Sequence, residues 1–258
     1  MDLDGASVLV TGASSGIGAA VARALTTHRV GHLGLVGRDV DRLAAVAANC
    51  QGPTRQTWAM DLGDLAGVDR LAQEAWELLD GVDVLVNNAA MPKRRGVLAL
   101  GDDEIEEVMR VNFHSPVRLA RRLLPLMIER GRGTVVNVSS LGGRLGILNE
   151  TAYSASKFAL TGWTEAAALD LWDQPVDVRL ITPGAIDTAI WHRPDNDAPH
   201  FEMDMASPES VADDIVASIV DDGPFEVYTP DMADIVAFKT ADIEAFQAGT
   251  IEALGPRS

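Results

Sequence analysis

Cysteine and aromatic residues are scarce in this sequence. Its 258 residues include a single cysteine, Cys50, so no disulfide can form within the chain, and no metal-binding spacing surrounds it. We therefore expect no metal site, and we expect Cys50 to be a small, buried or half-buried hydrophobic residue. Aromatic side chains make up 5% of the chain, while alanine, valine and leucine are abundant. This mixture favours helices packed on a parallel sheet over a β-sandwich.

Positive charge is also in short supply. The chain carries 21 Lys and Arg against 38 Asp and Glu, for a net charge of -17. Such an acidic surface repels phosphate backbones and anionic membranes, so neither nucleic acid nor a membrane is an expected partner. No apolar stretch approaches the length that spans a bilayer. The N-terminus lacks a basic region followed by an apolar one, which argues against a secretion signal. The sequence predicts a cytoplasmic protein.

Short apolar runs alternate with longer stretches of helical period along the chain. Hydrophobic residues make up 47% of it, enough to bury a sizeable core. Apolar strands joined by helices predict an α/β, doubly wound parallel sheet, a Rossmann fold of seven strands, in a single domain over residues 1–258. The expected strands are Ser7–Val10, His32–Val36, Arg55–Met60, Val82–Val86, Thr134–Val138, Val176–Ile181 and Phe225–Tyr228. The expected helices are Ala19–Thr27, Val40–Asn49, Leu65–Leu79, Ile105–Glu129, Ala155–Trp172 and Pro208–Val220.

A glycine-rich turn, T-G-A-S-S-G-I-G, follows the first expected strand. Glycines at a strand-to-helix turn allow positive φ and let a pyrophosphate approach bare backbone. The next helix points its first N–H groups and the positive end of its dipole at that phosphate. A plain glycine-rich loop is the alternative, but the place of the turn in an α/β pattern favours a dinucleotide. The expected binding residues are Gly12, Ser14, Ser15, Gly16, Ile17 and Gly18.

The ends of the second and third strands are expected to meet the adenosine half of this dinucleotide. Arg38 follows the second strand and can pair with the 2′-phosphate of NADP, whereas the adjacent Asp39 can bind the ribose hydroxyls of NAD. Because Arg38 comes first, we favour NADP(H), with NAD(H) as the alternative. After the third strand come Asp61 and Leu62. Asp61 can accept hydrogen bonds from the adenine amino group, or it can cap the helix that begins near Asp64.

A tyrosine and a lysine four residues apart, Tyr153 and Lys157, share one face of an expected helix. A nearby ammonium lowers the pKa of a tyrosine, which can then exchange the proton of an alcohol while a hydride moves. Ser140 ends the fifth strand and can hydrogen-bond to the substrate oxygen. Asn88 and Ala89 end the fourth strand and face the same crevice, because ligands bind at the carboxyl ends of parallel strands.

Together these motifs resemble the short-chain dehydrogenase/reductase (SDR) family. T-G-x-x-x-G-I-G, N-N-A, V-N-F, N-V-S-S, Y-x-x-x-K and P-G follow one another in the family's order between Thr11 and Thr188. The resemblance implies an NAD(P)-dependent oxidoreductase acting on a CH–OH group, with Tyr153 as general acid/base and Ser140 orienting the substrate oxygen. It implies that Lys157 lowers the tyrosine pKa and holds the ribose, and that Asn112 fixes a water in a proton relay through Lys157. It also places Pro183, Gly184 and Thr188 on the nicotinamide side.

The chain departs from the family's pattern at two places. Ala90 replaces the usual glycine after N-N-A, which adds one methyl group. A tail over residues 230–258 continues past the last expected strand with an amphipathic pattern, and it can pack on its own subunit, line an interface or close the pocket. The apolar residues of this tail would allow a lipid dehydrogenase that binds a membrane surface, but the negative net charge argues against that alternative. A dinucleotide-sensing protein without turnover is a further alternative, but Tyr153 and Lys157, whose loss would mark it, are both present.

Residues 189–206 are expected to cover the substrate pocket. This segment carries Trp191, His192, Phe201, Met203 and Met205, and Leu141, Leu145 and Leu148 lie between the serine and the tyrosine. Such a lining favours an apolar or alicyclic alcohol or ketone as the small-molecule substrate. The expected pocket residues are Leu141, Leu148, Trp191 and His192.

The helix that carries the tyrosine has apolar residues on several sides between Ala155 and Leu171. A helix that covers one face of a sheet needs only an apolar stripe, so the surplus indicates a partner. Together with the resemblance, this predicts a homodimer or homotetramer.

Overall fold

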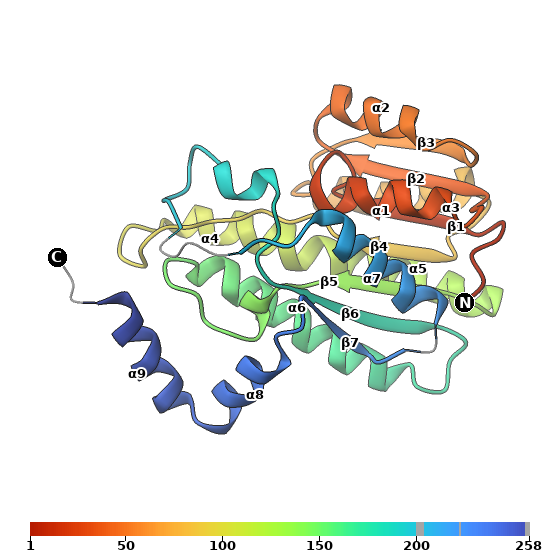
Figure 1. The fold of residues 1–258 in the computed structure, drawn as a ribbon. Helices are drawn as coiled ribbons and strands as arrows, with labels where there is room; N and C mark the ends of the chain where they lie inside the picture. Colours follow the sequence, from red (N-terminus) through yellow and green to blue (C-terminus); the bar gives the residue numbers. More distant parts are fainter. Residues whose placement is uncertain (200–203, 222, 256–258) are drawn as a thin grey trace.

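One sheet of seven parallel strands forms the centre of the computed structural model, which describes residues 1–199, 204–221 and 223–255 (Figure 1). The chain leaves β1 for β2 and β3 on one side and returns to the other side of β1 for β4 to β7, so the doubly wound fold is confirmed. Each strand overlaps an expected one, and the bounds differ by at most two residues. In spatial order the strands are β3 (Thr54–Ala59), β2 (His32–Gly37), β1 (Ser7–Thr11), β4 (Val84–Asn87), β5 (Thr134–Val138), β6 (Asp177–Pro183) and β7 (Glu226–Thr229).

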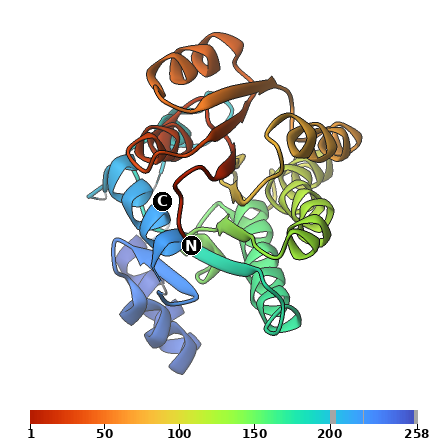
Figure 2. The ribbon, with the colours of Figure 1, turned by 90° about the vertical axis from the view of Figure 1, so that its right-hand side faces the viewer.

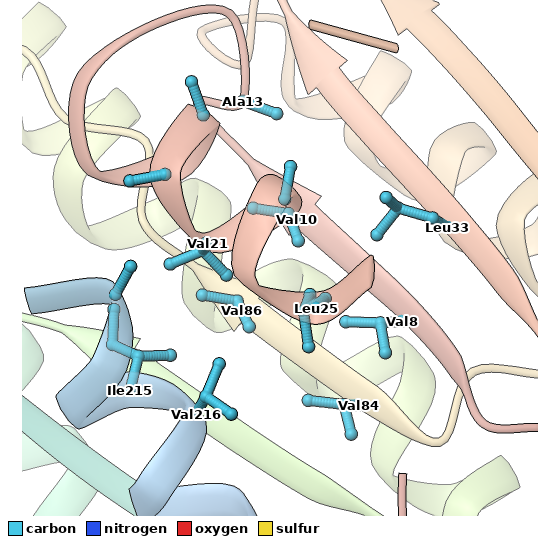
Figure 3. Packing of buried hydrophobic residues seen from close by; sticks show 14 of the residues in the cluster. Val8, Val10, Ala13, Val21, Leu25, Leu33, Val84, Val86, Ile215 and Val216 are labelled. Carbon is cyan, nitrogen blue, oxygen red and sulfur yellow. The ribbon is translucent and has the colours of Figure 1, made fainter. Parts of the chain in front are cut away.

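Helices cover both faces of the sheet because successive strand residues point to opposite sides. Val8 and Val10 of β1 belong to one buried cluster (Figure 3), and Leu9 between them belongs to the other. Burying an aliphatic side chain of this size stabilises the fold by about 1.5–3 kcal/mol. The first cluster is closed by α1 (Gly16–Thr26), α2 (Val40–Asn49) and α7 (Pro208–Val220), and the second by α3 (Leu65–Leu78), α5 (Ser115–Arg130) and α6 (Thr151–Asp170).

The long helix expected over Ile105–Glu129 is interrupted. It consists of α4 (Asp102–Met109), a π-helical turn η1 (Arg110–His114) and α5. Pro116, near the start of α5, directly follows the interruption and has no N–H to donate to the carbonyl four residues earlier. That carbonyl belongs to Asn112, so the interruption falls at a residue expected in the active site. Two short 3-10 turns, η2 (Leu141–Gly143) and η3 (Ala189–His192), complete the loops beside the sheet.

The C-terminal tail forms two helices, α8 (Ala233–Ala241) and α9 (Ile243–Leu254), which stand away from the sheet in Figures 1 and 2. No described residue of either helix is buried. The ring centres of Phe238 and Phe246 lie 6.3 Å apart, and this contact joins the two helices. The Lys239 Nζ lies 5.3 Å from the ring centre of Phe158 on α6. Across the described part of the chain, no helix has the length and apolar character needed to cross a bilayer.

Candidate active site

A cleft of about 600 Å³ opens at the carboxyl ends of the strands, where the strand order reverses. It extends from the turn after β1 to the loop after β6. Of the residues expected to bind cofactor or substrate or to act in catalysis, two lie outside the lining, Gly18 and Asn112. The expected residues that line it are Gly12, Ser14, Ser15, Gly16, Ile17, Arg38, Asp61, Leu62, Asn88, Ala89, Ser140, Leu141, Leu148, Tyr153, Lys157, Pro183, Gly184, Thr188, Trp191 and His192.

The turn after β1 has a backbone that only glycine fits. Gly12 has φ +69°, and a Cβ there would lie 2.8 Å from the Cα of Ala89. Gly16 has φ +53°, and a Cβ would meet Thr188 at 3.0 Å. A Cβ on Gly18 would press on the Gly12 carbonyl oxygen. Gly18 therefore lets α1 pack against the turn, which explains why it lies behind the lining and not in it.

This turn fits the pyrophosphate of a nicotinamide dinucleotide. Helix α1 begins at Gly16, directly beside the cleft, and the side chain of its N-cap residue Ser15 makes no capping hydrogen bond. The first N–H groups of a helix have no partners within it, and they carry the positive end of its dipole. The bare glycine backbone, two serine hydroxyls and these N–H groups supply the donors that a phosphate needs.

The N-N-A motif holds the turn in place. The Asn88 side-chain amide donates a hydrogen bond to the Thr11 carbonyl oxygen at 2.9 Å. The backbone N–H groups of Asn88 and Ala89 both donate to the Thr11 hydroxyl, at 3.0 and 3.1 Å. Asn88 thus lines the cleft while its amide ties the end of β4 to the end of β1.

Charged residues surround the end of β2. Arg38 is exposed in the lining, and it has no ion pair within the described residues. Asp39 caps α2 by accepting from the Arg42 backbone N–H at 3.0 Å, and it pairs with the Arg42 guanidinium at 2.6 Å. These hydrogen bonds with Arg42 hold the pKa of Asp39 below its usual range. Asp61 accepts from the Gly63 N–H at 2.8 Å, and the N-cap of α3 is Asp64, so Asp61 does not cap that helix.

Ser140, Tyr153 and Lys157 lie together in the wall of the cleft. The Lys157 Nζ is buried, donates to the Val138 carbonyl oxygen at 2.9 Å, and lies 5.8 Å from the Tyr153 ring centre. Burial lowers the pKa of Lys157 to about 7. Burial also raises the pKa of Tyr153 to about 12, opposed by a hydrogen bond with Ser140 and assisted by the charge of Glu150. Lys157 is not among the groups that shift this pKa, so the expectation that Lys157 lowers the tyrosine pKa stays a prediction.

Asn112 is fully buried behind this wall, and its side chain does not reach the cleft. Its amide oxygen accepts from the Met91 N–H at 2.7 Å, and its amide nitrogen donates to the Met91 carbonyl at 2.9 Å and to the Ser156 hydroxyl at 3.0 Å. The side chain joins the loop after β4 to α6. The main-chain carbonyl of Asn112 lacks the usual helical hydrogen bond, because the residue four positions later is Pro116, which has no N–H to donate.

The substrate end of the cleft is mainly apolar. Leu141, Leu148 and Trp191 lie there with Ile147 and Ile190, whereas Leu145 is buried in the core behind the cleft. His192 also lines the cleft and is exposed. Met205 lies outside the lining, and Phe201 and Met203 fall outside the described residues.

Sequence reasoning missed a buried ion pair at this end, between Arg94 and Glu150, with 3.3 Å between Nη1 and Oε1. Both residues line the cleft. The sequence signal was the run Lys93, Arg94 and Arg95, three residues after the N-N-A motif, three consecutive cations in a chain with an excess of acidic residues.

Comparison with known proteins decides the family. A family model described as short chain dehydrogenase matches residues 6–199. The chain belongs to the short-chain dehydrogenase family. Nodulation protein G of Rhizobium meliloti (strain 1021) is 35% identical over 190 residues, covering 73% of this chain and 76% of that protein. Galactitol 2-dehydrogenase of Agrobacterium fabrum (strain C58 / ATCC 33970) is 32% identical over 192 residues, covering 74% of each chain.

Solved structures of short-chain dehydrogenases have the same fold. A metagenomic short-chain oxidoreductase in complex with NADP is 30% identical, with a TM-score of 0.76 over 88% of this chain and 98% of that chain. A short-chain dehydrogenase/reductase from Burkholderia phymatum in complex with NAD is 25% identical, with a TM-score of 0.85 over 95% of this chain and 96% of that chain. As a member of the family, this dehydrogenase is an oxidoreductase that transfers a hydride between a nicotinamide dinucleotide and the CH–OH group of an alcohol or the corresponding ketone. The comparisons give no support to a binding protein without turnover.

Proposed function

We propose that Tyr153 is the general acid/base of this dehydrogenase and that Ser140 holds the reacting oxygen of the substrate. The observation that carries this assignment is the meeting of Ser140, Tyr153 and Lys157 in one wall of the cleft that also contains the glycine turn. The dinucleotide, when bound, supplies or accepts the hydride. With its pKa raised to about 12, Tyr153 keeps its proton at neutral pH and is ready to donate it to a carbonyl oxygen.

We propose that Lys157 positions the nicotinamide ribose and relays a proton between Tyr153 and solvent, toward Tyr153 in carbonyl reduction and away from it in alcohol oxidation. A pKa near 7 lets this lysine take up or release a proton at neutral pH. Asn112 takes part in the relay through its main-chain carbonyl at the π-helical turn, fixing a water beside Lys157. Pro183, Gly184 and Thr188, at the end of β6, form the nicotinamide side of the cleft.

For the cofactor we propose NADP(H), with NAD(H) as the second choice. The support comes from the end of β2, where Arg38 faces the cleft with no ion pair among the described residues, while Asp39 is engaged by Arg42. A guanidinium can bind a 2′-phosphate in two places at once, whereas a carboxylate that is already engaged is less able to bind ribose hydroxyls.

For the substrate we propose an apolar or alicyclic ketone or the matching alcohol. Leu141, Leu148 and Trp191 provide apolar surface around the reacting group. We propose that residues 189–206, of which 200–203 lie outside the described residues, cover this pocket, and that residues 1–258 are a single domain. We also propose a cytoplasmic location. Cys50 is the single cysteine and is buried, so the chain cannot form an internal disulfide that an oxidising compartment would stabilise.

We further propose a homodimer or homotetramer. Leu169, near the end of α6, and Trp172, just after it, are 74% and 81% exposed, and Lys239 of α8 lies over the ring of Phe158 on α6. Light scattering at micromolar concentration tests the assembly. A stable, active monomer of 27.5 kDa would contradict it.

The reaction is tested with a panel of ketones and alcohols, each offered with both cofactors and followed at the absorption band of the reduced nicotinamide. We expect turnover of apolar cyclic ketones with NADPH. Turnover of sugars alone would contradict the proposed substrate class, and a preference for NADH would contradict the proposed cofactor.

A further inference from the structure

Three consecutive cations after β4 lie against the segment that follows β6. The Lys93 Nζ is buried between the carboxylates of Glu104, at 2.7 Å, and Asp195, at 3.3 Å. Arg95 donates from its Nη2 to the Asp195 carbonyl oxygen at 3.2 Å. The two segments are about a hundred residues apart in sequence, yet these contacts fix one on the other.

Arg94 makes the most contacts of the three. Its Nε donates to the Asp197 carbonyl oxygen at 2.9 Å, and its Nη2 donates to the Trp191 carbonyl oxygen at 3.0 Å. The guanidinium also lies 5.1 Å from the ring centre of Trp191. In the backbone, the Asp197 N–H donates to the Arg94 carbonyl oxygen at 2.9 Å. A planar guanidinium with donors in a rigid fork can hold several acceptors at once, which an ammonium cannot do.

The remaining Arg94 contact leads to the catalytic helix. Nη1 pairs with Glu150, which is the N-cap residue of α6 and stands three positions before Tyr153. The Arg94 and Glu150 side chains are 4% and 9% exposed. Every nitrogen of the guanidinium already has a protein partner, and the carboxylate of Glu150 already neutralises its charge. The place of Arg94 in the lining is therefore best explained by these protein contacts.

We propose that Arg94 and Glu150 are positioning residues for this oxidoreductase: Arg94 clasps residues 191–197 over the substrate end of the cleft and holds the Glu150 carboxylate in a fixed place beside Tyr153. This inference rests on the proposed function of Tyr153. Arg94 thus attaches the segment that carries Trp191 to α6, the helix that also carries Tyr153.

Glu150 also sets the electrostatic surroundings of the tyrosine. Its negative charge raises the pKa of Tyr153, while burial raises the pKa of Glu150 itself and Arg94 opposes that rise. The other titratable or charged groups that line the cleft are Lys157 on α6, His192 and Arg193 in the loop after β6, and Arg38, Asp39, Arg42 and Asp61 beyond the ends of β2 and β3. Replacing Glu150 with a neutral residue removes one negative charge and leaves these groups in place.

The clasp is tested with Arg94→Gln, and with Arg29→Gln as the matched control. Arg29 forms an exposed ion pair with Asp4, remote from the cleft. We expect hydrogen–deuterium exchange in residues 188–199 to rise in Arg94→Gln and to stay at the wild-type level in Arg29→Gln. We expect the KM for the carbonyl substrate to rise about tenfold, with kcat and the Kd of the cofactor within about twofold. Arg94→Lys keeps the buried charge but not the fork, so it reports on the same exchange if Arg94→Gln does not fold.

The role of Glu150 is tested by the pH profile of carbonyl reduction. Glu150→Gln should move the alkaline limb of kcat to lower pH, because the neutral amide no longer raises the pKa of Tyr153, whereas Glu150→Asp should keep the limb near its wild-type place. An unmoved limb in Glu150→Gln overturns the electrostatic role. Unchanged exchange in residues 188–199, or an equal rise across the whole chain, overturns the clasp. If the wild type turns over no carbonyl compound at all, the proposed function fails, and the exchange measurement still decides the clasp.

Discussion

Replacing Gly12 with alanine should both destabilise the fold and weaken binding of the dinucleotide, and the chain contains the controls that separate the causes. Gly12 has φ +69°, and a Cβ there would lie 2.8 Å from both the Ala89 Cα and the Asn88 amide nitrogen. Left-handed backbone costs an alanine about 1–2 kcal/mol, and overpacking adds about 1–3 kcal/mol. The expected loss in the free energy of unfolding is therefore roughly 2–5 kcal/mol.

Two matched variants isolate the contributions. Gly5→Ala has the same kind of backbone, φ +73°, with nothing within 4 Å of the new Cβ, so it should lose only about 1–2 kcal/mol. Gly18→Ala needs no positive φ and gains about 1 kcal/mol of helix propensity, but its Cβ meets the Gly12 carbonyl oxygen. Urea unfolding measures stability, provided that the slope m is unchanged, and quenching of protein fluorescence measures the Kd of the cofactor. Equal losses in Gly12→Ala and Gly5→Ala would refute the argument from close packing, and undiminished cofactor binding in Gly12→Ala would refute the role of the turn.

Three further outcomes follow from the site. Tyr153→Phe should lower kcat by about 10²–10⁴-fold while leaving the Kd of the cofactor nearly unchanged, and near-parental turnover on an established substrate would remove Tyr153 from the mechanism. Arg38→Ala should weaken NADPH binding by roughly 1.5–3 kcal/mol and NADH binding far less. The control is Arg70→Ala, which breaks an exposed ion pair with Asp64 outside the cleft. Equal effects of Arg38→Ala on both cofactors would contradict a contact between Arg38 and the 2′-phosphate. For Lys157, the folded-state pKa of about 7 lies below the ordinary 10.5, so between these values the unfolded chain binds the extra proton and stability rises with pH. This gain in the free energy of unfolding is complete above pH 10.5 and is lost as the pH falls through about 7. Unfolding midpoints of Lys157→Met should rise less over this window than those of the wild type, and parallel curves would show that Lys157 is not the cause.

Local patterns in the sequence were enough to predict the sheet and the glycine turn. The central strands β1 and β4 contain the uninterrupted apolar runs Val8–Val10 and Val84–Val86, and T-G-A-S-S-G-I-G carries its own backbone requirements. The division of the expected helix Ile105–Glu129 into α4, the π-helical turn and α5 was harder to predict. A proline inside a helical pattern does not by itself say where the helix changes its hydrogen bonding.

Contacts between distant segments were out of reach. Arg94 and Glu150 are separated by 56 positions, and no periodic pattern links them before the fold brings them together. The raised pKa of Tyr153 was out of reach for a related reason. The nearness of Lys157 follows from a four-residue spacing, whereas the desolvation of both groups arises only from how closely the surrounding chain packs.

The strand order has a consequence for protein engineering. Arg38 follows β2 and Ser140 follows β5, and β1 and β4 lie between those strands. With neighbouring strands about 4.8 Å apart, the two positions are separated by about 14 Å. Substitutions that far apart and without shared contacts usually combine additively. A library at the end of β2 can therefore be selected for use of one dinucleotide or the other, and a second library at Leu141, next to Ser140, can be selected for new ketones. The best member of each can then be joined in a single gene without a further round of optimisation.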